Sequence, residues 1–118
     1  MSTNRERTLK RLFEELEGIS DKEYQRRVWI RGEGPECDDF GESVCRYSLL
    51  AESIFDEYKE LGFSDIQFDT FKKFHAEYEK FWEDNDWPPL FIDTPEWTKI
   101  TEMAKEVLKA FNHPKKSS

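Results

Sequence analysis

The segment from Gly32 to Glu42, GEGPECDDFGE, holds the residue types with the clearest capacity for chemistry. It contains five acids, three of the five glycines and one of the two cysteines, and it contains no base. Carboxylate oxygens in a glycine-containing loop suit a hard cation such as Ca²⁺. The acids lack, however, the regular spacing of an EF-hand calcium loop. We therefore place a metal second to a structural or binding role and expect no cofactor.

Catalytic motifs are otherwise missing from the sequence. His75 lies on an aromatic helix face, where a partly buried, hydrogen-bonded histidine is the expected state, and His113 lies beside a proline. No nucleophile elbow, zinc-peptidase motif or phosphate-binding loop occurs. Cys37 and Cys45 are eight residues apart without a CxxC pair, which disfavours zinc. We expect a non-enzymatic protein, with a metal-dependent hydrolase using the acid-rich loop as the lesser alternative.

The distribution of charge is more informative. The net charge is −8 and the isoelectric point is about 4.8, which disfavours binding to a phosphate backbone and suits a basic partner. A second base-free run spans residues 81–98 and contains Trp82, Trp87 and Trp97. Trp82 and Trp97 fit a core position and a binding surface equally well. Trp87, beside Pro88 and Pro89, is expected to be exposed or to line a groove.

Acids beside exposed aromatic rings are typical of a protein-binding surface, because the rings supply affinity and the charges supply fast, selective encounter. The predicted contact residues for a basic protein partner are Glu33, Glu36, Asp38, Asp39, Glu83, Asp84, Asp86 and Trp87. Asp39 and Glu42 also have a sufficient role at a helix start. Glu33, Glu36 and Asp38 have no role in this scheme other than partner binding.

Apolar residues recur at helical spacing along most of the chain. The predicted helices cover residues 4–17, about 21–29, 40–61, 66–84 and 95–111. Short strands at 28–31 or 89–92 remain possible, residues 65–68 could begin as an extended segment, and 87–92 is not expected to be helical because of its paired prolines. The prediction is an all-α, single-domain bundle of about five helices, residues 1–118, with fraying at 1–3 and 114–118.

Capping residues define the expected helix ends. Glycine is expected to end the first helix at Gly18 and the third at Gly62, with Phe63 packing beside the second of these. Pro95 follows the predicted N-cap Thr94 and is expected to take the first position of the last helix. The predicted N-caps are Thr3, Ser20, Asp39 and Thr94.

Composition supports a globular domain with a core of aromatic rings. The chain has 118 residues, of which 15% are aromatic, and the rings compensate for a modest hydrophobic content of 36%. Two cysteines are too few for a disulfide framework. No signal peptide and no run long enough to span a membrane is evident, so a cytoplasmic location is expected.

The segment from Tyr24 to Pro35, YQRRVWIRGEGP, followed by the DFGE step at residues 39–42, resembles small bacterial immunity proteins of contact-dependent growth inhibition and related polymorphic toxin systems. The resemblance covers roughly residues 20–45. It implies an inhibitor that binds a cognate toxin domain in the cytosol, often a nuclease with a basic surface, and blocks its active site. It assigns no contact residues by position. A helical adaptor or nucleic-acid-mimicking regulator is the alternative binding function.

Overall fold

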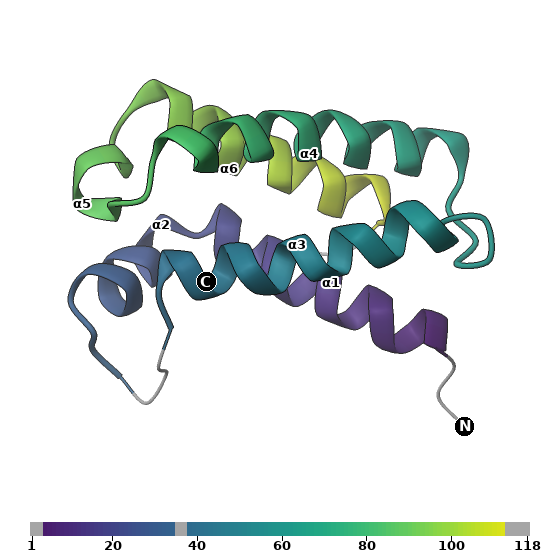
Figure 1. Ribbon diagram of the computed structural model, residues 1–118, viewed down its shortest axis with the longest axis horizontal. Helices are drawn as coiled ribbons and strands as arrows, with labels where there is room; N and C mark the ends of the chain where they lie inside the picture. The colour runs from purple at the N-terminus through teal and green to yellow at the C-terminus, as the bar shows by residue number, and fades with distance from the viewer. Residues whose placement is uncertain (1–3, 35–37, 113–118) are drawn as a thin grey trace.

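The computed structural model describes residues 4–34 and 38–112, and in these residues all regular structure is helical (Figure 1). Four long helices carry the fold, and three short segments join them at one end. The elements in chain order are α1 (Asn4–Ser20), α2 (Lys22–Tyr24), the π-helix η1 (Gln25–Ile30), α3 (Phe40–Glu57), α4 (Asp65–Asp84), α5 (Pro88–Phe91) and α6 (Pro95–Ala110). The predicted all-α bundle of about five helices is confirmed.

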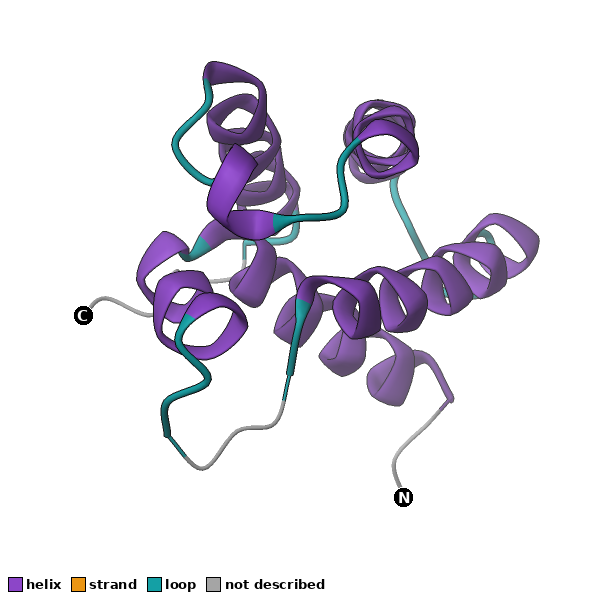
Figure 2. Ribbon diagram, turned by 60° about the vertical axis from the view of Figure 1, so that its left-hand side comes forward, coloured by secondary structure: helices purple, strands orange, loops and turns teal. Residues whose placement is uncertain are grey.

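The long helices form two layers, with α4 and α6 in one and α1 and α3 in the other (Figures 1 and 2). Helix α6 is the central element, because it packs against both α1 and α4, and α1 packs in turn against α3. The short elements α2, η1 and α5 gather at one end of the long axis, where η1 contacts α5. None of the described helices is long and apolar enough to cross a membrane.

Side-chain caps position several helix starts. The Asp39 carboxylate accepts a hydrogen bond from the backbone N–H of Glu42 at 2.8 Å, and the Thr94 hydroxyl accepts one from Trp97 at 3.2 Å. Both predicted caps are thus confirmed. Helix α4 begins at Asp65 without an extended segment, because Ser64 and Gln67 form a reciprocal capping box. Thr3 lies outside the described residues.

The first helix was predicted to end at Gly18, but it continues to Ser20. The buried Gln25 amide donates to the Gly18 and Ile19 carbonyls at 2.8 Å each, so a side chain from the next segment of the chain satisfies the carbonyls at the helix end. The side-chain oxygen Oε1 of Gln25 accepts a hydrogen bond from the Trp97 indole N–H at 2.8 Å. The next helix is capped by Asp21, not by Ser20, whose hydroxyl donates to the carbonyl of Glu17.

Helix α3 ends at Glu57, earlier than the predicted residue 61, and turns continue to Gly62. Gly62 has a φ of 79°, and the Phe63 N–H donates to the Tyr58 carbonyl at 3.1 Å. This bond pattern and the left-handed glycine confirm the predicted turn at Gly62.

The possible strands are absent from the described residues. Residues 25–30 form the π-helix, and the Arg31 N–H donates to the Arg26 carbonyl five residues back, at 3.0 Å. The prediction that 87–92 is not helical is wrong. Pro88 and Pro89 occupy the first turn of α5, where a missing N–H costs nothing, and Ile92 N–H donates to the Pro88 carbonyl at 2.9 Å.

The core is built from aromatic rings, and Trp97 on α6 is at its centre. Its side chain is fully buried, so the core interpretation of Trp97 is correct. The ring centroids of Trp29, Phe40, Phe81 and Phe91 lie 4.9 to 6.3 Å from that of Trp97. These rings come from η1, α3, α4 and α5, so a single aromatic cluster joins the short end elements to the long helices. Trp82 is partly buried and packs beside this core.

Candidate functional site

The end of α4 and the turn into α5 form an exposed corner of the molecule. Glu83 and Asp84 lie at the end of α4, Asp86 and Trp87 follow, and Leu90 lies on α5. All five are exposed, and the exposed fractions of Trp87 and Leu90 are 61% and 78%. The predicted exposure of Trp87 is confirmed. We call these five residues the α5 corner.

A buried foundation holds the corner in place. Pro88, Phe91 and Ile92 are buried beneath it, so α5 turns its other residues outward. The Leu90 N–H donates to the Trp87 carbonyl at 3.0 Å, and the two prolines restrict the backbone. A backbone held in this way loses little conformational freedom when a partner binds, which favours affinity.

The acids of the corner keep their charge available. Within the described residues, the carboxylates of Glu83, Asp84 and Asp86 form no ion pair or side-chain hydrogen bond. Asp93, beyond α5, differs: it pairs with Arg26 of η1 at 2.6 Å, and this hydrogen bond lowers the pKa of Asp93. Of these acids, the three of the corner are therefore the ones that carry uncompensated charge.

Asp84 also reaches a groove of about 320 Å³ between α4 and α6, which Glu96 lines from the other helix. Phe81 and Ile100 supply apolar lining. Across this groove Lys99 lies 3.7 Å from Glu77, which compensates part of the negative charge. Lys80 also lines the groove, so its walls carry both signs of charge and the groove is less acidic than the corner itself.

Asp38 does not belong to an exposed binding surface, contrary to the prediction. Its side chain is 8% exposed, and Oδ2 accepts hydrogen bonds from the Tyr24 hydroxyl at 2.9 Å and the Trp29 indole at 3.1 Å. Oδ1 lies 3.0 Å from Nη2 of Arg46 on α3 as an ion pair. Glu15 of α1 also bonds Arg46, and these contacts raise the pKa of the guanidinium. Asp38 thus has a structural role that the sequence did not reveal.

The other acids of the 32–42 segment have different roles. Asp39 is exposed and caps α3, as described above. Glu33 is exposed and its Oε1 lies 2.9 Å from Nε of Arg31, so part of its charge is compensated. Glu36 lies outside the described residues. Asp38 therefore faces inward, whereas Glu33, Asp39 and Glu42 are the described acids of this segment that a partner could reach.

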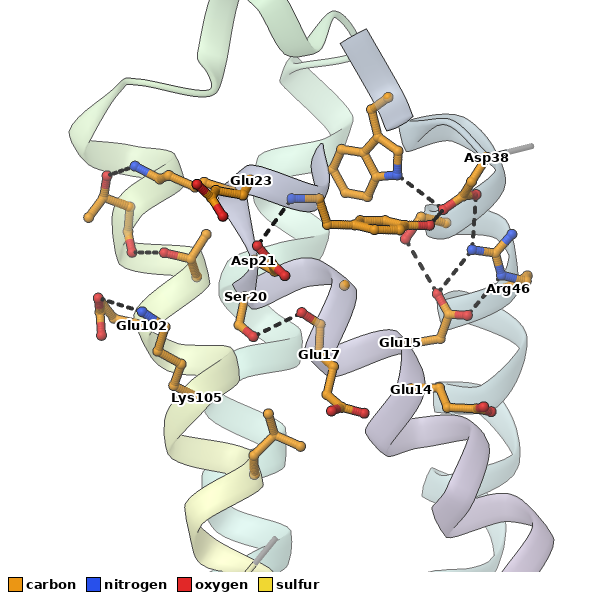
Figure 3. A pocket seen from close by; sticks show the side chains of 18 residues that line it. Glu14, Glu15, Glu17, Ser20, Asp21, Glu23, Asp38, Arg46, Glu102 and Lys105 are labelled. Carbon is orange, nitrogen blue, oxygen red and sulfur yellow. Dashed lines mark hydrogen bonds and ion pairs between the residues drawn. The ribbon is translucent and has the colours of Figure 1, made fainter. Parts of the chain in front are cut away.

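The two predicted acidic segments lie at the same end of the long axis, with η1 and α2 between them (Figure 1). A larger groove of about 850 Å³ opens between α1, α2, α3 and α6 (Figure 3). Many of its polar side chains bond to one another: Lys22 donates to the Thr98 hydroxyl at 2.7 Å, and Lys105 pairs with Glu102 at 3.2 Å. The first contact ties α2 to α6 and the second lies within α6, so these polar side chains already have structural partners.

No catalytic constellation is evident in the described residues. His75 is partly buried and shares a 3.1 Å hydrogen bond with the Tyr47 hydroxyl, and burial lowers the pKa of His75. This confirms the expected structural state of His75. No group of three or more His, Cys, Asp or Glu side chains within residues 4–34 and 38–112 is arranged to hold a metal ion.

Leu90 is the residue of the corner that the sequence prediction missed. The usable signal was the pair Pro88-Pro89, which fits a first helical turn. Such a turn would direct Leu90 to a different side of the helix from the buried Phe91. Arg46 was also missed, because its carboxylate partners, Glu15 and Asp38, lie in other elements of the fold.

Compared with protein-family models, curated proteins and solved structures, the chain gives no match.

Proposed function

We propose that the chain is a cytoplasmic immunity protein, which binds a cognate toxin with a basic surface and blocks it stoichiometrically. The observation that carries the proposal is the α5 corner. It holds a tryptophan that is 61% exposed, on a backbone held by buried neighbours, beside three carboxylates that form no ion pair with any residue the structure describes. The resemblance of residues 20–45 to immunity proteins supports the same function.

The physical basis is complementarity of charge and of apolar surface. Unpaired carboxylates raise the rate at which a basic protein associates, to the order of 10⁸ M⁻¹s⁻¹ at low salt. A large exposed ring supplies short-range affinity once water is excluded, as at the centre of many interfaces. Inhibition by coverage requires no catalytic group on the inhibitor.

The proposal is tested by affinity capture from the native cells, run in parallel with the chain and with its Asp84→Lys/Asp86→Lys variant. A protein captured by the chain and lost by the variant is then expressed alone and together with the chain. We expect growth arrest when it is expressed alone and restored growth on co-expression. A captured protein that is harmless when expressed alone would contradict the immunity function and favour an adaptor.

Association kinetics with the purified partner test the surface itself. Reversing charge at Asp84 and Asp86 should slow association at least about tenfold at low salt without unfolding the domain, because both side chains are exposed. The matched control is Glu52→Lys/Asp56→Lys, the same change of charge at two exposed positions of α3. Equal association rates for the two double variants would exclude the α5 corner.

A further inference from the structure

We infer that Trp87 and Leu90 form an apolar anchor, on which a basic protein segment seats an apolar side chain between its own lysines or arginines. The inference deepens the proposed function and rests on it. It names what the partner must present at this site: an apolar residue at the centre and cationic residues around it. It also adds Leu90 as a determinant of affinity.

Two large apolar side chains are exposed close together in sequence at the α5 corner. Trp87 and Leu90 are three residues apart in one turn, joined by the Leu90 N–H bond to the Trp87 carbonyl. The other most exposed large apolar residues, Leu49 on α3 and Ile66 on α4, lie on separate helices. A tryptophan beside a second apolar residue on a rigid turn is a favourable binding hot spot.

The acidic side chains of the corner select the class of partner. Glu83, Asp84 and Asp86 lie close to the anchor in sequence, and their carboxylates form no ion pair within residues 4–34 and 38–112. Such a surface repels nucleic acid and anionic lipid headgroups, whereas it attracts a cationic polypeptide. Among the basic side chains nearby, Arg26 pairs with Asp93 and Lys99 with Glu77, while Lys80 shares the groove with Asp84 without an ion pair to it within the described residues.

The carboxylates and the anchor affect different rate constants. The carboxylates act over several ångströms and accelerate encounter, so their effect falls with added salt. The anchor acts only in contact and therefore determines how slowly the complex dissociates. A partner recognised by charge alone would show no dependence of dissociation on Trp87 or Leu90.

The test uses two synthetic 14-residue peptides of equal positive charge, one of lysine and leucine and one with serine at every leucine position. Each is titrated into the isotopically labelled full chain and followed by NMR. We expect the leucine peptide to shift the Trp87 indole N–H and the Leu90 methyl signals, and to bind at least tenfold more tightly than the serine peptide. Leu90→Ser should remove this difference, whereas Leu49→Ser, the matched exposed leucine on α3, should preserve it.

Three outcomes would overturn the inference: equal affinity for the two peptides, no shift at Trp87 and Leu90 with either peptide, or binding of the chain to phosphatidylcholine vesicles through the same signals. The last outcome would identify a lipid surface as the occupant. Each outcome is separable from failure of the proposed function, because capture and growth rescue by the natural partner do not use these peptides.

Discussion

At the scale of single residues, aspartates of equal chemistry have opposite roles in this protein. Asp38 is nearly buried and accepts hydrogen bonds from Tyr24 and Trp29 while it pairs with Arg46. Asp84 is exposed and forms no ion pair within the described residues. A nearly buried carboxylate with three partners stabilises the fold, because its removal leaves partly buried donors without an acceptor.

Three acids of the 32–42 segment should therefore differ in their effect on stability. We expect Asp38→Ala to lower the free energy of unfolding by about 2–4 kcal/mol, because it leaves the Tyr24 hydroxyl and the Trp29 indole without their acceptor and removes one of the two carboxylates that pair with Arg46. Asp39→Ala should cost about 1 kcal/mol through loss of the N-cap, and Glu33→Ala less than about 0.5 kcal/mol. Urea denaturation followed by far-UV circular dichroism measures all three, and equal costs would contradict the assigned roles.

At the scale of elements, a side chain from a neighbouring segment decides where α1 ends. Gly18 has an ordinary helical backbone, because Gln25 satisfies the carbonyls of residues 18 and 19. Gly62, by contrast, has a φ of 79° in the turn after α3. The two glycines look alike in sequence, since each follows an amphipathic helix, but only one occupies the left-handed region that favours glycine.

Alanine should therefore have opposite effects at these two positions. Gly18→Ala should raise the free energy of unfolding by about 0.5–1 kcal/mol, since the new Cβ lies 3.8 Å from the Tyr24 ring, an ordinary contact. Gly62→Ala should lower it by about 1 kcal/mol or more, because the backbone there is left-handed. Thermal and urea denaturation measure both variants, and destabilisation by Gly18→Ala would show that α1 ends at Gly18.

At the scale of the whole molecule, the aromatic core makes the short end elements and the long helices one unit. Rings from η1, α3, α4 and α5 meet Trp97 of α6. Loss of any one of these elements opens the environment of the others, so partial unfolding is costly. The α5 corner is accordingly an exposed surface whose backbone is anchored to the core through the buried Phe91.

Unfolding should therefore be a single cooperative transition, with the same midpoint by tryptophan fluorescence and far-UV circular dichroism. Trp97→Ala should lower the free energy of unfolding by about 3–5 kcal/mol, because it opens a cavity at the centre of the core. Trp87→Ala is the matched control and should change stability by less than about 1 kcal/mol, since its ring is exposed. Two separate transitions in the unsubstituted chain would contradict a single core.

The sequence by itself determined the features that depend on neighbours along the chain. Apolar spacing of three and four residues predicted the long helices, and local capping chemistry predicted the starts at Asp39 and Thr94. Residues 81–98 were recognised as a base-free acidic and aromatic run, and Trp87 was expected to be exposed. These inferences needed only contacts within a few residues of one another.

The tertiary structure decided the features that depend on partners in other elements of the fold. The burial of Asp38 depends on Arg46 and on two rings of the preceding helical segments, and the end of α1 depends on Gln25, whose side chain also bonds Trp97, 72 residues away. The exposure of Leu90 follows from which side of α5 packs on the core. A carboxylate or a leucine has no intrinsic preference strong enough to settle such a position, because its free energy depends on the groups that the fold brings beside it.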